Sequence, residues 1–417
     1  MNWQTKKLGE IFNIERGGSP RPIEEYITDD KNGINWIKIG DTKGVTKYIT
    51  KTNEKIKPEG LKKTRMVYEN DFILSNSMSF GRPYIMKTNG CIHDGWLVIR
   101  KNENIDNNYL YYVLTSNQVY VQFSTLAKGS TVKNLNIAAV KEVEIPVPPL
   151  ETQHAIVSKI EELFSELDKG IAELKTAQQQ LKTYRQSVLK SAFEGKLTNE
   201  NVKDGELPDG WEWKTFSDVC VRIGDIDHKM PKKTENGKYP YLSTKDITNN
   251  FKLSFDNVKL ISEEDYLMLS RKIKPEKGDI IFPRYGTIGK NVLVDTDKKF
   301  LISYSCAIIK PNTNLINEKY IYLFSLSPKV TDEIRKYVVE TTQANIGIGS
   351  IKSFVFPLAP LEDQHRVVQE IESRLSVADK MEQSIQESLQ KAEALRQSIL
   401  KKAFCGELVN KENLATI

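Results

Sequence analysis

The chain contains few cysteines, and the four that it has are scattered: Cys91, Cys220, Cys306 and Cys405. They form no CxxC pair, so we expect a reducing compartment with no disulfide framework and no zinc site. The sequence lacks an apolar run of about 18 residues, which a transmembrane helix would need. Its opening stretch, MNWQTKKLGE, lacks the apolar centre of a signal peptide. We therefore expect a cytoplasmic location.

Catalytic motifs are missing as well. The segment GTIGKN at 286–291 does not have the GxxxxGK(S/T) spacing of a phosphate-binding loop, and no GxGxxG opens a helix after a strand. The sequence has no Asn-Pro-Pro-aromatic stretch of the kind that adenine methyltransferases use. Asp225, Asp227 and His228 are metal-ligand types, but we interpret them as an exposed polar turn. We predict no catalytic activity, no metal and no cofactor, and interpret the chain as a binder or organiser.

What the sequence does contain is an internal repeat. The segment PLETQH at 149–154 recurs as PLEDQH at 360–365, and the similarity runs for about fifty residues without a gap. Each copy follows proline-rich extended chain and ends in Ala-Phe-x-Gly-x-Leu, the first at Leu197 and the second at Leu408. Two copies are too few for a solenoid, so the repeat indicates a duplicated half-molecule.

The repeated segments have the pattern of long amphipathic helices. Apolar residues recur at steps of three and four, and neither segment contains a proline after its start. A helix of about 35 residues would be roughly 50 Å long. Its narrow apolar stripe predicts that the two helices pair as an antiparallel coiled coil; the alternative is that each packs on its own globular half. The residues predicted to pair are Ile160, Leu163, Leu167, Ile171, Leu174, Leu375, Ala378, Ile385, Leu389 and Ile399.

A region of short strand-like runs precedes each helix, and the runs occur in the same order in both halves. The runs are 34–40, 71–76, 96–100 and 108–116 in the first half, and 239–244, 279–284, 306–310 and 319–327 in the second. We therefore predict a tandem duplication of mixed α/β (α+β) globular domains, each followed by a long helix. The expected parts are a first domain at 1–145, a first helix at 146–200, a linker and second domain at 201–357, and a second helix at 358–417.

The net positive charge lies in the predicted globular parts. The net charge of the chain is +5, made up of +5 in residues 1–150 and +3 in 201–360, against −1 in 151–200 and −2 in 361–417. Basic globular parts joined by mildly acidic helices are typical of nucleic-acid binding by the globular parts. A random distribution of surface charge is the alternative.

Loops between the strand-like runs concentrate the residue types that contact DNA. Arg, Lys, Asn, Gln, Ser and Thr hold phosphates or read base edges, and Arg and Gln can pair bidentately with guanine and adenine. An ordinary solvated loop is the alternative for each single residue, but four such loops recur at corresponding places in both halves. The foremost predicted contacts are Arg82, Lys133, Arg284 and Gln343. The full predicted set is Arg21, Lys43, Asn76, Ser79, Arg82, Lys128, Thr131, Lys133, Lys229, Lys232, Lys233, Lys245, Arg284, Tyr285, Thr287, Lys290, Thr342 and Gln343.

The segments IPVPPLETQHAIVSKIEEL at 145–163 and FPLAPLEDQHRVVQEIESRL at 356–375, with the closing YRQSVLKSAFEGKL and LRQSILKKAFCGEL, give the chain a family resemblance. Over essentially its full length it resembles the specificity (S) subunits of type I restriction-modification enzymes. The resemblance implies two target-recognition domains, each reading one part of a split double-stranded DNA target, held by two antiparallel helical regions. It implies assembly with two methyltransferase (M) subunits and then restriction (R) subunits. The implied subunit is not catalytic, although the assembled complex would be an adenine-N6 methyltransferase and ATP-dependent endonuclease.

Two other functions fit part of the sequence. A coiled-coil scaffold with two partner-binding domains would explain the repeat and the helices, but not the confinement of basic charge to the globular parts. A solitary restriction enzyme that has lost its catalytic half is the second alternative. Salt dependence of duplex binding separates the first from a DNA reader, because phosphate contacts release counterions.

Overall fold

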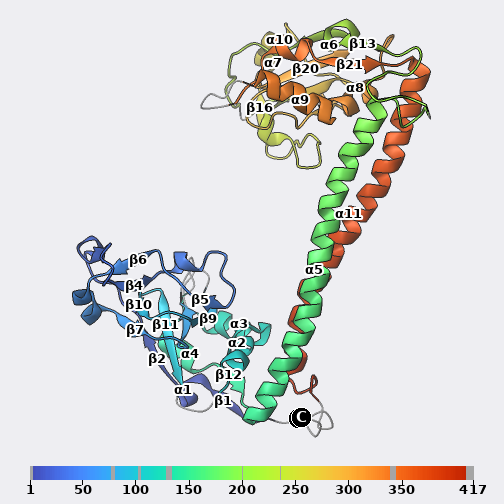
Figure 1. Cartoon of the computed structure of the whole chain (residues 1–417). Coiled ribbons are helices and arrows are strands. Elements are labelled where there is room, and N and C mark those ends of the chain that lie inside the picture. The colour runs from blue at the N-terminus through green and yellow to red at the C-terminus, as the bar shows by residue number, and fades with distance from the viewer. Residues whose placement is uncertain are drawn as a thin grey trace. The chain divides into compact units, whose positions relative to one another are not determined.

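The computed structural model describes residues 3–76, 80–101, 105–127, 134–199, 201–234, 236–338 and 344–409. The chain forms two compact units (Figure 1). Unit 1 consists of Met1–Leu174 with Glu387–Ile417, and unit 2 consists of Lys175–Gln386. Each unit therefore contains one globular domain and a part of each long helix. Within the described ranges, no helix has the length and hydropathy of a membrane span.

The first domain combines two mixed five-stranded sheets with short helices. One sheet has the strand order β2-β11-β8-β9-β5 and the other β3-β6-β4-β10-β7, while β1 pairs with β12. Its elements are β1 (Thr5–Lys7), α1 (Leu8–Ile11), β2 (Phe12–Arg16), η1 (Ile23–Glu25), β3 (Ile27–Thr28), β4 (Ile34–Ile37), η2 (Ile39–Thr42), β5 (Tyr48–Ile49), β6 (Glu54–Ile56), η3 (Pro58–Lys63), β7 (Arg65–Val67), β8 (Phe72–Ser75), β9 (Pro83–Met86), β10 (Gly90–Ile92), β11 (Trp96–Lys101), α2 (Asn107–Thr115), α3 (Asn117–Leu126), α4 (Ile137–Lys141) and β12 (Glu144–Pro146).

The second domain repeats this framework with fewer strands. The antiparallel order β14-β20-β17-β18 corresponds to β2-β11-β8-β9, the parallel pair β15–β19 to β4–β10, and β13–β21 to β1–β12. Its elements are β13 (Glu212–Thr215), α6 (Phe216–Val219), β14 (Cys220–Gly224), β15 (Tyr239–Leu242), η4 (Thr244–Asp246), β16 (Lys259–Ile261), α7 (Glu263–Leu269), β17 (Ile280–Pro283), β18 (Val292–Leu293), β19 (Leu301–Ile302), β20 (Cys306–Pro311), α8 (Glu318–Ser325), α9 (Pro328–Tyr337), α10 (Ile348–Lys352) and β21 (Val355–Leu358). The predicted duplication of mixed α/β domains is confirmed.

Three of the four strand-like runs in each half contain a strand, and the fourth is wrong in both. Residues 108–116 and 319–327 lie in helices α2 and α8 instead. Their aromatic residues are typical of strands, but each helix is started by an N-cap. The Asp106 carboxylate accepts a hydrogen bond from the amide of Tyr109, and Asn317 caps α8 in the same way. Capping and burial of one helix face therefore outweigh the β-propensity of these segments.

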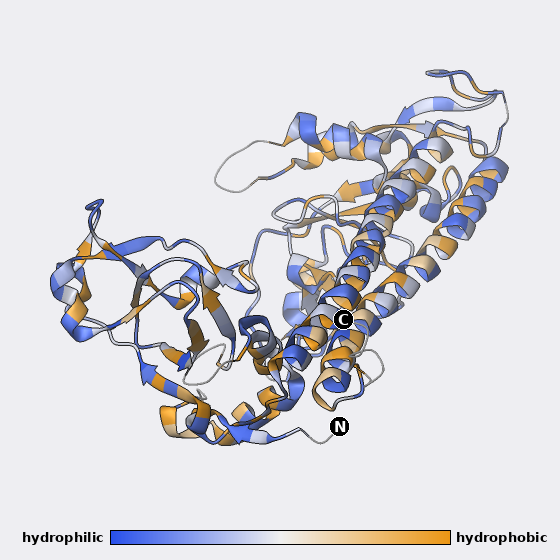
Figure 2. Cartoon of the chain, turned by 60° about the horizontal axis from the view of Figure 1, so that its bottom comes forward, coloured by the Kyte–Doolittle hydropathy of each residue, from blue (hydrophilic) through white to orange (hydrophobic). Residues whose placement is uncertain are grey.

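The two long helices lie within the predicted parts 146–200 and 358–417 and exceed the expected length of about 35 residues. Helix α5 (Leu150–Phe193) and helix α11 (Leu361–Phe404) have 44 residues each, which corresponds to about 66 Å at 1.5 Å per residue. Hydrophobic and hydrophilic residues alternate along both of them (Figure 2), as an amphipathic helix requires. Only one side of each helix can therefore be buried against a partner.

The core of unit 1 joins the first domain to the start of α5 and the end of α11. Ile156 and Ile160 of α5 are buried in the same cluster as Ile399 and Phe404 of α11. The Phe404 ring meets the Tyr109 ring of α2 edge-on, with 5.6 Å between the ring centroids. The last turns of α11 thus complete the core of the first domain.

Unit 2 is built in the corresponding way. Val188 and Phe193 at the end of α5 are buried with Val367 and Ile371 at the start of α11 and with the second domain. The Phe193 ring lies edge-on to that of Tyr320 in α8, with 5.1 Å between the centroids. Each domain is therefore held by the start of the helix that follows it and by the end of the other helix.

Ion pairs between the helices show that they run antiparallel. In unit 1 the Arg396 guanidinium pairs with the Asp168 carboxylate. In unit 2 the Arg185 guanidinium pairs with Asp379 at 2.7 Å and with Glu382 at 2.8 Å. Contacts early in α5 thus match contacts late in α11, and the reverse. The predicted antiparallel arrangement is confirmed.

The predicted pairing residues are buried to different extents. Ile160, Ala378, Ile385 and Ile399 are buried, and Ile160 and Ile399 share one core. The others are partly buried: Leu163, Leu167, Ile171, Leu174, Leu375 and Leu389. The alternative, that each helix packs on its own globular half, also describes part of the structure, because Ile160 and Leu375 pack against the cores of their own domains.

The repeated glutamine of PLETQH and PLEDQH fastens each long helix to its domain. Gln153 is buried, its side-chain oxygen accepts from the Asp106 amide at 2.9 Å, and its side-chain nitrogen donates to the Pro148 carbonyl at 2.9 Å. Asp106 is the residue that caps α2. A single side chain therefore links the start of α5, the preceding proline segment and the start of α2.

Gln364 does the same in unit 2. Its side-chain oxygen accepts from the Asn317 amide at 2.7 Å, and its nitrogen donates to the carbonyls of Ala359 at 2.7 Å and Leu315 at 3.1 Å. Asn317 caps α8. We call Gln153 and Gln364 with these bonds the glutamine clamps. They explain why the repeat begins with this motif twice, since each domain needs the same attachment to its helix.

Candidate nucleic-acid interface

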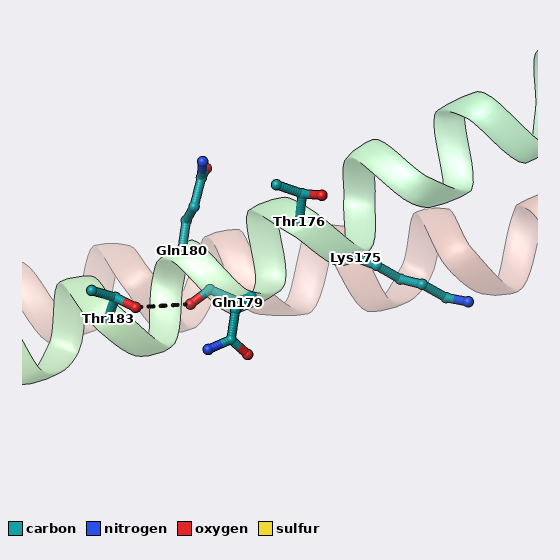
Figure 3. A pocket seen from close by; sticks show the side chains of 5 residues that line it. All are labelled: Lys175, Thr176, Gln179, Gln180 and Thr183. Carbon is teal, nitrogen blue, oxygen red and sulfur yellow. Dashed lines mark hydrogen bonds between the residues drawn. The ribbon is translucent and has the colours of Figure 1, made fainter.

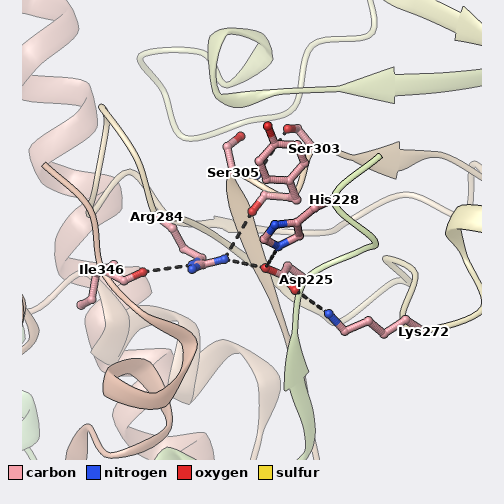
Figure 4. A network of polar contacts seen from close by, with 8 residues as sticks. Asp225, His228, Lys272, Arg284, Ser303, Ser305 and Ile346 are labelled. Atoms are coloured by element: carbon pink, nitrogen blue, oxygen red, sulfur yellow. Dashed lines mark hydrogen bonds and ion pairs between the residues drawn. The ribbon is translucent and has the colours of Figure 1, made fainter. Parts of the chain in front are cut away.

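Four loops of the second domain meet at one end of the sheet β14-β20-β17. The Arg284 amide, after β17, donates to the Ser305 carbonyl before β20 at 2.8 Å. The Ile346 amide, before α10, donates to the Arg284 carbonyl at 3.0 Å. Asp225, after β14, accepts from the Arg284 guanidinium at 2.5 Å. We call this the second-domain loop cluster (Figure 4).

A buried carboxylate organises this cluster. Asp225 is 5% exposed, and its oxygens accept from the Lys272 ammonium at 2.8 Å and from the Arg284 guanidinium, which is itself 8% exposed. Burial alone would raise the pKa of Asp225. Hydrogen bonds from Lys272 and His228 and the charges of Lys272 and Arg284 outweigh that effect and lower it. Asp225 is therefore ionised at neutral pH, and its negative charge offsets one of the positive charges of Lys272 and Arg284.

His228 lies at the open side of the network. Its Nε2 is 3.0 Å from the Asp225 carboxylate, and its ring stacks on Tyr304 with 4.6 Å between centroids and 20° between planes. The side chain is nevertheless 60% exposed. Arg284 also donates to the Tyr304 carbonyl at 3.4 Å. The same guanidinium therefore contacts both Asp225 and Tyr304, the two residues that hold the His228 ring.

The first domain has a corresponding loop cluster around Asp94. Arg16 donates through Nε to the Asp94 carbonyl at 3.0 Å, and Asn76 donates to the same carbonyl at 2.9 Å. The Ser19 hydroxyl donates to the Asp94 carboxylate at 2.8 Å. The Leu135 amide donates to the Asn76 carbonyl at 2.8 Å, the bond that Ile346 makes with Arg284 in the second domain. The same backbone framework thus carries different side chains in the two halves.

The two most buried predicted contacts are not available at the surface. The Arg284 guanidinium is bonded to Asp225 and to the Ile346 carbonyl, the latter at 3.0 Å, and Asn76 is 1% exposed. To reach a base, Arg284 would have to break these bonds, and Asn76 would have to break its bond to the Asp94 carbonyl. We therefore reassign Arg284 and Asn76 from reading DNA to supporting the loops.

The other predicted contacts within the described residues are at least partly exposed. Arg21, Lys43, Arg82, Lys229, Lys232, Lys233, Lys245 and Thr287 are exposed, and Tyr285 and Lys290 are partly buried. Arg82 lines a cleft of unit 1 with Lys47, Tyr111 and Arg396, facing the helices as well as its own domain. Predicted contacts that lie outside the described residues are Ser79, Lys128, Thr131, Lys133, Thr342 and Gln343.

The sequence did not identify His228 and Tyr304 as a pair. The spacing of Asp225, Asp227 and His228 predicts an exposed polar turn, which is wrong for Asp225, because that side chain is 5% exposed. Across the described ranges, no group of three or more His, Cys, Asp or Glu side chains is arranged to hold a metal ion. The partners of Asp225 are Arg284 and Lys272, 59 and 47 residues further along the chain.

A groove along α5 in unit 2 offers less chemistry (Figure 3). Lys175, Thr176, Gln179, Gln180 and Thr183 line it, all from one helix. The hydrogen bond between the residues drawn runs from the Thr183 hydroxyl to the Gln179 carbonyl at 3.4 Å, which is ordinary for a threonine in a helix. The loop clusters, where several loops converge and polar side chains are held by hydrogen bonds, are the better candidate interfaces.

The chain is similar to proteins of one kind in sequence and in structure. Residues 1–176 and 208–391 match the family described as type I restriction modification DNA specificity domain. The specificity subunit of the type I restriction enzyme EcoBI from Escherichia coli is 26% identical over 98% of this chain and 86% of its own length. The MjaIX specificity subunit of Methanocaldococcus jannaschii is 26% identical over 98% of this chain and 94% of its own.

Solved structures support the fold. A chain from a study of complex assembly and conformational transition of the type I R-M system superposes with a TM-score of 0.72 at 20% identity, covering 97% of this chain and 98% of that one. The HsdS subunit of Thermoanaerobacter tengcongensis gives a TM-score of 0.53 at 19% identity, with 97% of each chain covered. At these identities the likeness concerns the fold alone.

Proposed function

Because this chain belongs to the family of type I restriction-modification DNA specificity proteins, we propose that it is the sequence-recognition subunit of such a complex and that each of its domains reads one half of a bipartite DNA target. The observation that carries the proposal is the pair of loop clusters. One framework, with the same backbone bond at Leu135 and at Ile346, presents different side chains in each half. Equivalent readers with different chemistry are what two unlike half-sites require.

The exposed cations in and around the clusters supply the sequence-independent part of binding. Lys229, Lys232 and Lys233 follow Asp225 on one exposed segment, where they can neutralise phosphates. Arg21 and Lys43 are exposed in the first domain. Each phosphate contact should add about 0.9 to the slope of the logarithm of affinity against the logarithm of salt concentration.

In this proposal the long helices set the spacing between the half-sites and dock two methyltransferase subunits, with restriction subunits joining the full complex. Two readers of one DNA face are separated by about 34 Å per helical turn, and helices of about 66 Å are long enough to span that distance. The chain itself is proposed to be non-catalytic and cytoplasmic. The assembled complex would methylate adenine N6 and cleave DNA in an ATP-dependent reaction.

A domain exchange tests the proposal. Residues 1–144 are replaced by the corresponding domain of a relative with a known target, and the methylome of a host that carries the exchanged chain is sequenced. One half of the methylated motif should change, and the other half should survive. A motif that changes in both halves, or in neither, would rule out the modular assignment. A chain that directs no methylation and binds duplexes without salt dependence would favour the coiled-coil scaffold instead.

A further inference from the structure

In the second-domain loop cluster, the exposed ring of His228 has one nitrogen bonded to Asp225 and the other facing away from it. Asp225 is ionised and can only accept hydrogen bonds, so the Nε2 atom 3.0 Å from it must carry a proton. In a neutral imidazole with its proton on Nε2, the Nδ1 atom has a free lone pair and accepts. Among the described residues, no hydrogen bond to Nδ1 is found.

The ring is also held in place. Stacking on Tyr304, with 20° between the ring planes, fixes its tilt, and the bond to Asp225 fixes its rotation. Asp225 in turn is held by Arg284 and Lys272. Such support lowers the entropy lost when the side chain binds a ligand, although the imidazole itself is 60% exposed.

A fixed acceptor discriminates among DNA groups. Phosphate oxygens and carbonyl oxygens are acceptors, so a neutral Nδ1 cannot bind them. In the major groove the base-edge donors are the amino groups N6 of adenine and N4 of cytosine. The neighbouring Lys229, Lys232 and Lys233 have the opposite preference, because an ammonium only donates.

We propose that His228 is a specificity-determining residue, whose Nδ1 accepts a hydrogen bond from the amino group of one adenine or cytosine in the half-site read by the second domain. This inference rests on the proposed function and adds the chemical identity of one contact to it. Asp225 and Tyr304 are positioning residues in this assignment, since they act only through the imidazole. The first domain would read its half-site differently, because its His93 already uses Nδ1 to accept from the Gly95 amide at 2.8 Å.

The test measures binding of the full chain, with its methyltransferase partners, to duplexes in which each base pair of the second half-site is changed in turn at about pH 8. His228→Ala should lose about threefold to tenfold of the discrimination at a single adenine or cytosine, the value of one hydrogen bond, and leave the other positions unchanged. His228→Gln, which can still reach Asp225 but lacks an acceptor at the Nδ1 position, should behave like His228→Ala. His228→Asn places an amide oxygen near that position and should restore part of the preference.

Base analogues locate the contact. Purine in place of adenine, or 2-pyrimidinone in place of cytosine, removes only the amino group. With the wild-type chain this replacement should cost the same threefold to tenfold, and with His228→Ala it should cost nothing further. Lys232→Ala is the control, and it should weaken all duplexes equally and reduce the salt slope by about one.

The outcomes distinguish failure of the His228 assignment from failure of the proposed function. Equal weakening of every duplex by His228→Ala, an unchanged profile, or an effect in the other half-site would overturn the assignment of His228 while the bipartite target stands. A wild-type chain without any base preference in the second half-site would instead overturn the proposed function.

Discussion

Removing a glutamine clamp should destabilise one unit and spare the other. In Gln364→Ala the buried Ala359 carbonyl loses its donor, at a cost of about 1–3 kcal/mol. The Asn317 amide and the Leu315 carbonyl lose partners too, but they lie nearer to water, which replaces part of each bond. The expected loss is about 2–4 kcal/mol in unit 2. Gln153→Ala breaks two bonds and should cost about 2–3 kcal/mol in unit 1.

The assay is urea unfolding combined with hydrogen–deuterium exchange, because the two units need not unfold together. In Gln364→Ala the Asn317 amide should exchange faster while the Asp106 amide keeps its protection, and Gln153→Ala should give the reverse. Gln369→Ala is the matched control, an exposed glutamine on the same helix α11, and should change stability by less than about 0.5 kcal/mol. If Gln364→Ala unfolds and exchanges like Gln369→Ala, the glutamine clamp does not stabilise unit 2.

Two further predictions concern the stability of the units. Because the pKa of Asp225 is lowered in the folded chain, its stabilising effect should be complete above the ordinary aspartate pKa of about 4 and be lost as pH falls through the lowered value. As pH falls, the melting temperature should drop more steeply for the wild type than for Asp225→Asn. Parallel curves would contradict a stabilising role of the ionised Asp225. Phe404→Ala should cost the first domain about 3–5 kcal/mol, because the ring fills that domain's core against Tyr109. In Phe404→Ala, amide hydrogen exchange should become faster in α2 and not in α8. Faster exchange in α8 alone would contradict the placement of Phe404 in the core of the first domain.

The sequence was sufficient for the architecture because periodicity and repetition are local signals. The duplication, the long amphipathic helices and six central strands, β4, β8, β11, β15, β17 and β20, could be predicted from it. The estimate of about 35 residues for each helix was too short, because α5 continues to Phe193 and ends where Gly195, in the closing Ala-Phe-x-Gly-x-Leu of the repeat, adopts φ of 75°. The strand predicted at 108–116 is wrong because β-propensity takes no account of the helix cap at Asp106.

The candidate site was predictable as a set of loops but not as individual contacts. Arg284 has the residue type and loop position of a base reader, yet its partner Asp225 lies 59 residues earlier in the sequence. Nothing in the local pattern indicates that the two side chains meet. The local sequence does not indicate the role of His228 either, since its orientation depends on Tyr304, 76 residues further along the chain. Contacts of this separation follow from the sheet order and not from spacing in the sequence.

The unequal similarity of the two halves follows from what each part must do. Each helix must be fastened to its domain by the same bonds, so the glutamine clamps recur at Gln153 and Gln364 with the same kinds of partner. The loop clusters need only the same backbone, and they differ at Asn76 and Arg284, where the backbone bond is kept and the side chain changes. A new target can therefore arise by substitution in the loops without disturbing the attachment that sets the position of the domain. On this argument, variants that alter base preference should cluster in the loops and leave the clamps intact.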